Sequence, residues 1–299
     1  MEKKLLFIYN SNAGKGQILA KLGEIIEVFV KGGYEVEVYP TQAPKDAIQK
    51  VENVRDDVSV IVCSGGDGTL DEVTTGMVKS GKNIPIGYIP IGTTNDYASS
   101  LGLSKNVVQA AFDIVDGEPK SYDVGIFNDD VFVYVAAFGL FTEVTYATNQ
   151  ELKKLFGHMA YVLEGVKSLA DVKAYHMKVE IEGEICEDEF IYGMVTNSTS
   201  VGGFKKLTGK NVELDDGTFE YTFIRKPKNL SEMQEIITNL LTADDKTEKI
   251  LSGKAKCVVV ESAEEVPWTL DGEFGGNQTF VRIDNLYHGM QIIRVPQEK

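Results

Sequence analysis

Hydrophobic and polar positions alternate differently in the two halves of the chain. In the first half, short apolar runs typical of buried strands are separated by segments whose apolar residues recur at helical spacing. The expected strands cover residues 5–9, 35–39, 58–63 and 84–89, and the expected helices cover residues 17–30, 45–54, 70–79, 97–101 and 107–115. Strands that alternate with helices through short connections indicate a mostly parallel sheet covered by helices.

After about residue 120, strand patterns dominate and many of them alternate between apolar and polar residues. The expected strands cover residues 122–127, 131–138, 174–182, 189–196, 220–225, 256–261, 280–283 and 291–295, with helices over 143–149, 157–169 and 230–241. This half is predicted to form a largely antiparallel sheet. We place the boundary at residue 122, which gives domains over residues 1–122 and 123–299.

Composition and charge exclude several classes of protein. The 299 residues include 43% hydrophobic residues, and 30 Lys and Arg against 45 Asp and Glu give a net charge of −15. So acidic a chain is not expected to bind nucleic acid or to attach strongly to an anionic membrane by charge. Cys63, Cys186 and Cys257 lack metal spacing and indicate reduced thiols. With no signal sequence and no apolar run long enough to span a bilayer, we expect a cytoplasmic protein.

The segment after the third expected strand has the form of a phosphate-binding loop. Ser64-Gly65-Gly66-Asp67-Gly68-Thr69 joins a buried strand to a helix, and its glycines allow a tight turn whose backbone can approach an anion. Asp67 does not suit phosphate directly, because a carboxylate repels it. The presence of Asp67 indicates that a metal ion or a reacting proton lies between its carboxylate and the phosphate.

Two further loops follow expected strands and should therefore lie at the same edge of the sheet. Asn10–Gly16 contains Lys15 but departs from the G-x-x-x-x-G-K-[ST] pattern, so it is either a phosphate loop or a glycine-rich turn. Pro90–Asp96 either caps a helix or brings Thr93 to phosphate and Asp96 to a metal ion or water near Asp67. The convergence of three such loops favours a phosphate site.

Acidic turns stand out in the second half. Asp215-Asp216-Gly217 and Asp271-Gly272 are each explained by a hairpin turn, since Asp-Gly is a common hairpin signal. The first could instead bind a hard cation, and Glu273 after the second could accept the proton of an attacking hydroxyl. The apolar stripe over residues 152–169 suits either a lipid-sized cleft or the core.

The motifs together resemble one family. Asn10–Gly14, Ser64–Glu72, Pro90–Ala98, Val201–Phe204, Leu214–Gly217 and Leu270–Glu273 occur in the order seen in the bacterial diacylglycerol kinase and lipid kinase family. Two differences are visible: Ser11 stands where many relatives carry proline, and Ser99 where arginine is usual. Neither changes Asp67 or Glu273.

The resemblance implies a fold and an activity. The fold class would be α/β plus β: a three-layer α/β nucleotide-binding domain with the GGDGT loop, a mostly antiparallel β-sandwich-like domain, and an active site in the cleft between them. The activity would be transfer of the γ-phosphate of ATP, with Mg²⁺, to the hydroxyl of a lipid reached by peripheral contact with the membrane surface. The family leaves the oligomeric state open, a homodimer included.

The resemblance also implies roles for individual residues. The nucleotide would bind at Asn10, Ser11, Asn12, Ala13, Gly14, Thr41, Gly66, Asp67, Gly68, Thr69, Leu70, Asp71, Glu72 and Thr93. Lys15 and Gly65, which lie in the same loops, complete the set of expected nucleotide-binding residues. Glu273 would be the general base, and Asp67 and Asp96 would organise Mg²⁺ and water. A structural Mg²⁺ would bind the Asp216 side chain and the main chain of Glu213 and Thr218.

Other functions stay open at this point. Diacylglycerol is the first candidate substrate, and phosphatidylglycerol or a sphingoid base are others. A kinase of NAD-kinase type shares the GGDGT sequence, although the two acidic motifs of the second half argue against it. A nucleotide-binding module without turnover is a further alternative, against which Glu273 argues.

Overall fold

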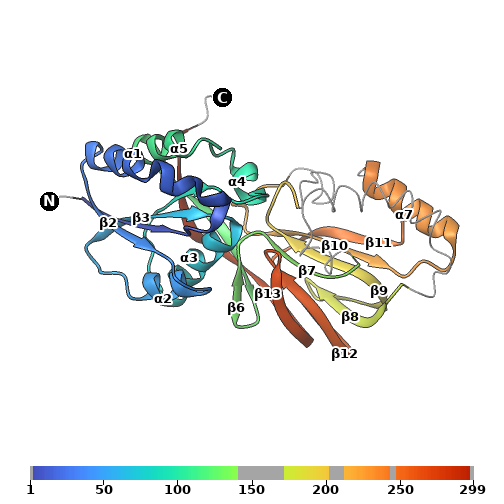
Figure 1. The fold of residues 1–299 in the computed structure, drawn as a ribbon. Helices are drawn as coiled ribbons and strands as arrows, with labels where there is room; N and C mark the ends of the chain where they lie inside the picture. The colour runs from blue at the N-terminus through green and yellow to red at the C-terminus, as the bar shows by residue number, and fades with distance from the viewer. Residues whose placement is uncertain (1–2, 141–171, 202–211, 243–246, 297–299) are drawn as a thin grey trace. The chain divides into compact units, whose positions relative to one another are not determined.

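The computed structural model of the chain describes residues 3–140, 172–201, 212–242 and 247–296 (Figure 1). The chain forms two compact units. Unit 1 comprises Met1–Val124 and Tyr287–Lys299, and unit 2 comprises Gly125–Leu286. The sequence pattern assigned all of 123–299 to the second domain, whereas the structure joins the C-terminal residues to unit 1. The reason is that the end of the last strand pairs with unit 1, at Ile292 against Ile86, and is buried there.

A parallel sheet forms the centre of unit 1, as the strand pattern predicts. Its strands are β1 (Lys3–Tyr9), β2 (Tyr34–Pro40), β3 (Val58–Gly65), β4 (Ile86–Pro90) and the last part of β13 (Glu273–Arg294). They lie in the order β13-β4-β3-β1-β2, and β1 to β4 all run in the same direction. β1 and β3 are almost entirely buried because helices cover both faces, which explains their continuous apolar sequence.

Helices cover the two faces of this sheet (Figure 1). The 3-10 helix η1 (Ala13–Gly16) leads into α1 (Gln17–Lys31), which packs with α5 (Val107–Asp116) on one face, and α2 (Asp46–Glu52) packs with α3 (Asp67–Ser80) on the other. The short helix α4 (Asp96–Leu101) follows β4. Phe7, Phe29, Val62 and Ile89 have no exposed surface and form the core between the sheet and α1. Burial of four such side chains is a main source of stability in this layer.

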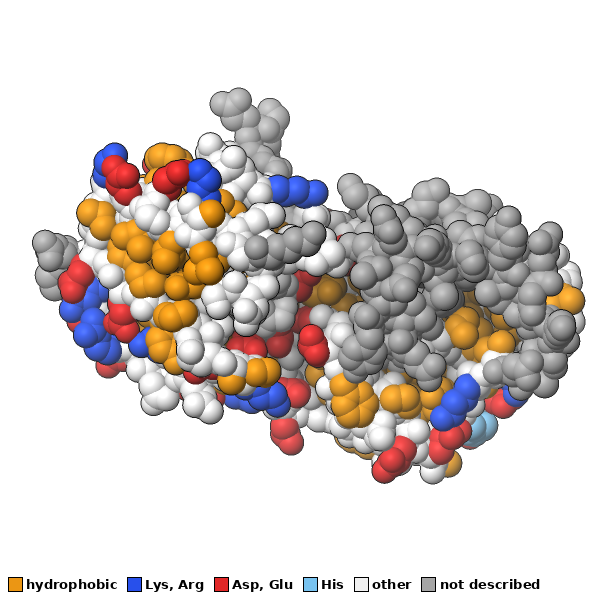
Figure 2. Space-filling view, in the orientation of Figure 1, with side chains coloured by type: hydrophobic (Ala, Val, Ile, Leu, Met, Phe, Trp, Pro, Cys, Tyr) orange, Lys and Arg blue, Asp and Glu red, His pale blue; other side chains and the backbone are white. Residues whose placement is uncertain are grey.

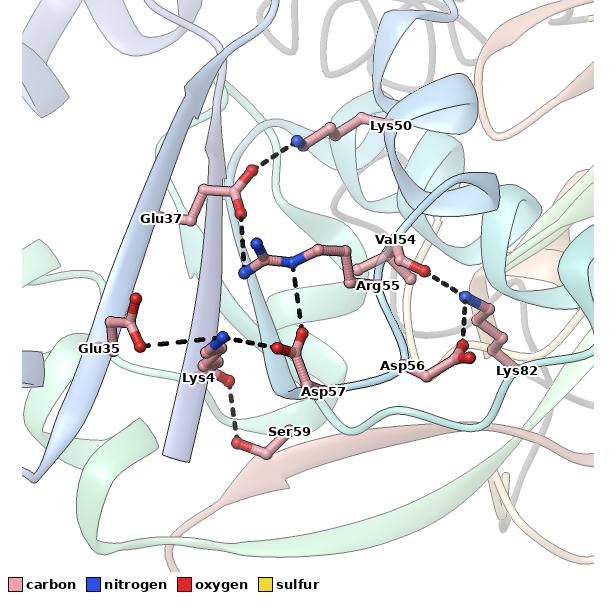
Figure 3. A network of polar contacts seen from close by, with 10 residues as sticks. All are labelled: Lys4, Glu35, Glu37, Lys50, Val54, Arg55, Asp56, Asp57, Ser59 and Lys82. Carbon is pink, nitrogen blue, oxygen red and sulfur yellow. Dashed lines mark hydrogen bonds and ion pairs between the residues drawn. The ribbon is translucent and has the colours of Figure 1, made fainter. Parts of the chain in front are cut away.

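Ion pairs gather around the starts of β1 and β3, at the amino edge of the sheet (Figure 3). Lys4 pairs with Asp57 at 2.6 Å, and Arg55 connects Asp57 to Glu37 at 3.3 and 3.7 Å. Lys82 pairs with Asp56 at 3.1 Å. Exposed pairs of this kind contribute at most about 1 kcal/mol each to folding. The charges at this edge therefore neutralise one another, while the glycine-rich loops lie at the opposite edge.

Unit 2 is built from antiparallel strands, as predicted. They are β6 (Asp130–Phe132), β7 (Val135–Gly139), β8 (Tyr175–Ile181), β9 (Glu184–Thr196), β10 (Phe219–Arg225), β11 (Ile250–Ala255), β12 (Cys257–Leu270) and the first part of β13, and β5 (Glu118–Phe127) passes from unit 1 into unit 2. The order β11-β10-β9-β7-β12-β13 forms the main path, and β8 pairs with both β9 and β12. Trp268, Phe138, Phe190 and Phe223 lie in the core. The helix α7 covers Leu230–Thr242.

Three details differ from the sequence prediction. The single strand expected over residues 131–138 is wrong, because a bend at Val133–Tyr134 separates β6 from β7. β11 was not expected, since Ser252, Gly253 and Lys254 hide its strand character. β12 and β13 are longer than predicted, because they pair with each other through interruptions in register. The expected helices at 143–149 and 157–169, and the 152–169 stripe, lie outside the described residues.

Candidate active site

Four strand ends lie level at one edge of the unit 1 sheet. Tyr9 at the end of β1 pairs with Pro40 of β2 and with Ser64 of β3, and Gly65 pairs with Pro90 of β4. The loops that begin at residues 10, 41, 66 and 91 therefore leave the sheet side by side. This is the edge at which parallel sheets bind ligands, and it carries every unit 1 residue that the sequence analysis proposed for the nucleotide.

The backbones of these loops lie against one another without side chains between them. A Cβ atom on Gly14 would lie 2.3 Å from the carbonyl oxygen of Ile91, and one on Gly92 would lie 2.6 Å from the Cα of Gly66. Both distances are too short for any side chain, so larger residues would force the loops apart. The glycines keep three loops close enough for their amides to contact a single ligand.

Asp67 and Asp96 meet at this edge. Asp67 is the first residue of α3 and Asp96 the first of α4, and the N–H of Asp96 donates a hydrogen bond to Oδ2 of Asp67 at 3.3 Å. Asp96 is only 3% exposed. The Asp67 carboxylate therefore lies against the first turn of a second helix, which itself begins with an acidic residue, beside the glycine-rich loops. Mg²⁺ in phosphoryl-transfer enzymes is commonly held by one or two carboxylates together with the phosphates, and this donor set fits such an ion.

Tyr88 lies under the glycine-rich turn, and the sequence analysis missed it. Its hydroxyl donates to the carbonyl of Gly65 at a long 3.5 Å, and the residue is 1% exposed. Burial, and then the negative charge of Asp67, raise the pKa of Tyr88 well above its usual value. The phenol stays protonated and supports the turn as a hydrogen-bond donor. Its place inside an apolar strand gave no sequence signal.

The loop before α4 is not stabilised by ordinary side-chain capping. Asn95 occupies the N-cap position with a left-handed φ of 51°, and its side chain makes no capping bond. Instead, its Nδ2 donates to the carbonyl of Gly92 at 2.8 Å. The side chain thus closes the turn over residues 92–95, and Thr93 is exposed on it. The Asn95 side chain therefore does not act as an N-cap, and ligand binding by this loop stays a prediction.

The first loop is folded by Asn10. Its N–H donates to the carbonyl of Ser64 at 2.9 Å, and its Oδ1 accepts from the N–H of Asn12 at 2.9 Å. Asn10 therefore ties the first loop to the end of β3 and bends the chain into η1, where Ala13, Gly14 and Lys15 lie. An Asx turn of this kind aims successive backbone amides in one direction.

Glu72 has a different environment from the one expected of a nucleotide ligand. Its two carboxylate oxygens accept from the N–H groups of Lys45 at 2.8 Å and Ala47 at 3.2 Å. These bonds fix the start of α2 and, with it, the loop that carries Thr41. The side chain of Leu70 has no exposed surface, so only its main chain can face a ligand.

The Asp271-Gly272 sequence forms the hairpin turn between β12 and β13. Its φ values of 50° and 88° are those of a two-residue type I′ turn, flanked by the pair Leu270 and Glu273. Glu273 is the first residue of β13 and is exposed. The turn interpretation is therefore correct for Asp271 and Gly272, and it leaves the Glu273 side chain available for chemistry.

The acidic turn at Asp216 contains a cation from the protein itself. Oδ1 of Asp216 accepts from the N–H and hydroxyl of Thr218 at 2.9 and 2.7 Å, and Oδ2 accepts from Lys254 at 2.6 Å. Lys254 also lies 3.3 Å from buried Glu220. Burial opposes ionisation of Asp216, but the bonds from Lys254 and Thr218 hold the pKa of its carboxyl below its usual range. Lys254, on the strand β11 that was not expected, carried no sequence signal.

Part of the motif series lies outside the described residues. Gly202, Gly203 and Phe204 of the Val201–Phe204 motif are among them. No helix in the described ranges is long and apolar enough to cross a membrane. On the face shown in Figure 2, basic side chains of the described residues lie beside acidic ones.

Comparison with known families covers both halves of the chain. Residues 4–127 match the diacylglycerol kinase catalytic domain, and residues 134–284 match the YegS C-terminal NAD kinase beta sandwich-like domain.

Individual relatives match over nearly the full length. A protein named diacylglycerol kinase from Staphylococcus carnosus (strain TM300) is 34% identical over 278 residues, which cover 92% of this chain and 90% of the relative. One from Bacillus subtilis (strain 168) is 32% identical, with 99% and 98% covered. A crystal structure of a diacylglycerol kinase from Bacillus anthracis str. Sterne has a TM-score of 0.77 and 25% identity, covering 98% of this chain and 97% of its own.

Proposed function

Because the chain belongs to the diacylglycerol kinase family, we propose that it transfers the γ-phosphate of ATP to the free hydroxyl of a lipid, with diacylglycerol as the acceptor. The product would then be phosphatidic acid. The observation that carries this proposal is the sheet edge where Asp67 and Asp96 meet beside closely packed glycine loops. Such an edge suits a polyphosphate and its metal ion.

The loops of unit 1 bind the triphosphate in this proposal. Backbone amides after Asn10, Gly65 and Gly92 donate to phosphate oxygens, and Lys15 adds a positive charge. Thr41, on the loop fixed by Glu72, contacts the nucleotide. Amides held in place before the ligand arrives stabilise charge without reorganising during the reaction.

Asp67 and Asp96 would hold Mg²⁺, which neutralises charge on the β- and γ-phosphates when bound. Oδ2 of Asp67 is oriented by the Asp96 N–H, so the carboxylate has a defined direction. Positioning and charge neutralisation account for most of the catalysis of phosphoryl transfer, which explains why the site needs no covalent nucleophile.

Glu273 accepts the proton of the attacking hydroxyl. The lipid oxygen then forms its bond to the γ-phosphorus while the bond from that phosphorus to the bridging oxygen of ADP breaks. The proton passes from Glu273 to solvent after ADP leaves. The attacking hydroxyl belongs to a lipid at the surface of the membrane.

The test is ATP- and Mg²⁺-dependent transfer of labelled phosphate to lipid alcohols in mixed micelles. The panel holds diacylglycerol, phosphatidylglycerol and a sphingoid base, with NAD as a soluble acceptor. Labelled phosphatidic acid formed with diacylglycerol as the preferred acceptor supports the proposal. Preference for another lipid changes the substrate, label in NAD changes the class, and ATP binding without any product removes the catalytic assignment.

A further inference from the structure

The carboxylate of Asp271 is surrounded by backbone amides. Oδ2 accepts from the N–H of Val133 at 2.6 Å, and Oδ1 accepts from those of Tyr134 and Val135, both at 2.9 Å. The N–H of Asp271 donates to the carbonyl of Val135 at 2.8 Å, and the residue is 8% exposed. Four hydrogen bonds therefore attach the tip of the β12–β13 hairpin to the bend between β6 and β7. Bonds from amides to an ionised carboxylate are stronger than neutral ones.

The bend that receives Asp271 is itself fixed from the other side. The carbonyl of Tyr134 accepts from the hydroxyl of Thr196 at 2.7 Å and from the N–H of Asn197 at 2.9 Å. Both residues have no exposed surface and lie where β9 ends. Asp271 is consequently attached to a rigid part of unit 2.

A second hairpin in unit 2 shows that the turn itself does not need this attachment. Glu182-Gly183, between β8 and β9, has φ values of 50° and 86°, almost identical to the 50° and 88° of Asp271-Gly272. Its acidic side chain accepts from one amide, that of Lys256 at 2.6 Å, and is exposed. The same turn thus forms with a single exposed bond. The three buried bonds of Asp271 must serve another purpose than turn formation.

We propose that Asp271 is the positioning residue for Glu273. Its anchored carboxylate fixes the hairpin tip and thereby the start of β13, from which the Glu273 side chain projects. The inference rests on the proposed function, because it gives Glu273 the role of base. Asp271 itself does not contact the substrate, and it acts only through the place and direction of Glu273.

Asp271→Asn tests this with little disturbance of the turn. Asn-Gly forms type I′ turns as readily as Asp-Gly, so the hairpin is kept. An asparagine must, however, present its NH₂ group to at least one of the three backbone N–H donors, so at least one of the three bonds is lost and the anchor is weakened. Because a displacement of about 1 Å can reduce a rate roughly 100-fold, we expect kcat to fall by about 10- to 100-fold. The KM for ATP should stay within about twofold of the parent value, because the nucleotide loops are in unit 1.

The decisive measurement is a double-mutant cycle of kcat with Asp271→Asn and Glu273→Gln. If Asp271 acts through Glu273, adding Asp271→Asn to Glu273→Gln has no further effect. Glu273→Asp provides the second background if transfer by Glu273→Gln is too slow to measure. Glu182→Gln is the matched control, since it removes an acidic anchor from an equal turn and should keep the parent kcat. Binding of an ATP analogue counts the folded molecules in each sample.

The inference is overturned if the two mutations reduce kcat independently, so that their losses multiply in the double mutant. It is also overturned if Asp271→Asn keeps the kcat of the parent. If Asp271→Asn does not fold, Asp271→Glu is used instead, because it keeps the charge while the added methylene shifts the hairpin tip. Asp271→Glu must then show the same fall in kcat with the KM for ATP unchanged. A parent kcat in Glu273→Gln would instead overturn the proposed base, whatever Asp271→Asn does, so the two failures are distinguishable.

Discussion

The N–H of Asp96 donates a hydrogen bond to the carboxylate of Asp67 at 3.3 Å, although 29 residues separate them in sequence. The bond orients the acidic residue of the glycine-rich loop by means of the first turn of α4. It links the second and third loops of the site at the point where a metal ion would be held.

Asp67→Asn should therefore lower kcat by about 100-fold or more, which is the scale of losing one charge-stabilising group in an active site. The mutation removes the negative charge but keeps the size and the acceptor for Asp96. The rate of phosphate transfer at a series of Mg²⁺ concentrations would measure this loss of kcat. Asp56→Asn, at the opposite edge of the same sheet, is the control and should behave as the parent. An unchanged Mg²⁺ dependence in Asp67→Asn would contradict the assignment.

Glu273→Gln should lower kcat by about 100- to 10,000-fold, the range for loss of a general base. Binding of ATP, measured by calorimetry, should not change. Glu265→Gln alters an exposed glutamate on the adjoining strand β12 and serves as control. Weakened ATP binding with normal turnover at saturation would show that Glu273 binds nucleotide and does not take the proton.

Glu72→Gln should raise the KM for ATP more than it lowers kcat. The carboxylate holds two backbone N–H groups at the start of α2, and loss of those bonds frees the loop that carries Thr41. Each bond to a charged group stabilises by roughly 1.5–3 kcal/mol, so the free energy of unfolding should also fall measurably. Steady-state kinetics and urea unfolding provide the two measurements, with Glu52→Gln at the other end of α2 as control. A fall in kcat alone would point to a direct part in chemistry.

The buried carboxyl of Glu220 should make stability depend on pH. Burial raises its pKa to about 7, against the opposing effect of Lys254. Because the pKa is higher in the folded state than in the unfolded chain, the stabilisation is complete below the unfolded value and is lost as pH rises through 7. Glu220→Gln should be more stable than the parent at pH 8, by on the order of 2 to 3 kcal/mol, with the difference vanishing below about pH 4. Thermal unfolding at both pH values would show it, and a constant difference would contradict it.

Removal of divalent cations should lower the melting temperature if Mg²⁺ binds at the Asp216 turn. We expect EDTA to lower the melting temperature of the parent and to leave that of Asp216→Asn unchanged. The melting temperature should fall by about 2–4 °C for each 1 kcal/mol of stability that is lost. Lys254→Met frees one oxygen of Asp216, so the effect of EDTA should increase. An identical melting temperature of the parent with and without EDTA would show that Lys254 is the only cation this turn needs.

The sequence by itself determined the two types of sheet, the loops at one sheet edge and the family. Apolar runs and glycines act locally, since a strand pattern depends on neighbouring residues and parallel strands always end at a common edge. The order of motifs from Asn10 to Glu273 identified the family, which the comparisons confirm.

Only the tertiary structure decided which polar groups meet. The N–H of Lys45 donates to Glu72 across 27 positions, and the N–H of Val133 donates to Asp271 across 138 positions. Lys254 reaches Asp216 from a strand that the sequence did not reveal. Hydrogen bonds between distant segments depend on where whole strands and helices pack, and no local pattern encodes them. For the same reason the tail after residue 286 joins unit 1, because its burial against β4 exists only in the folded chain.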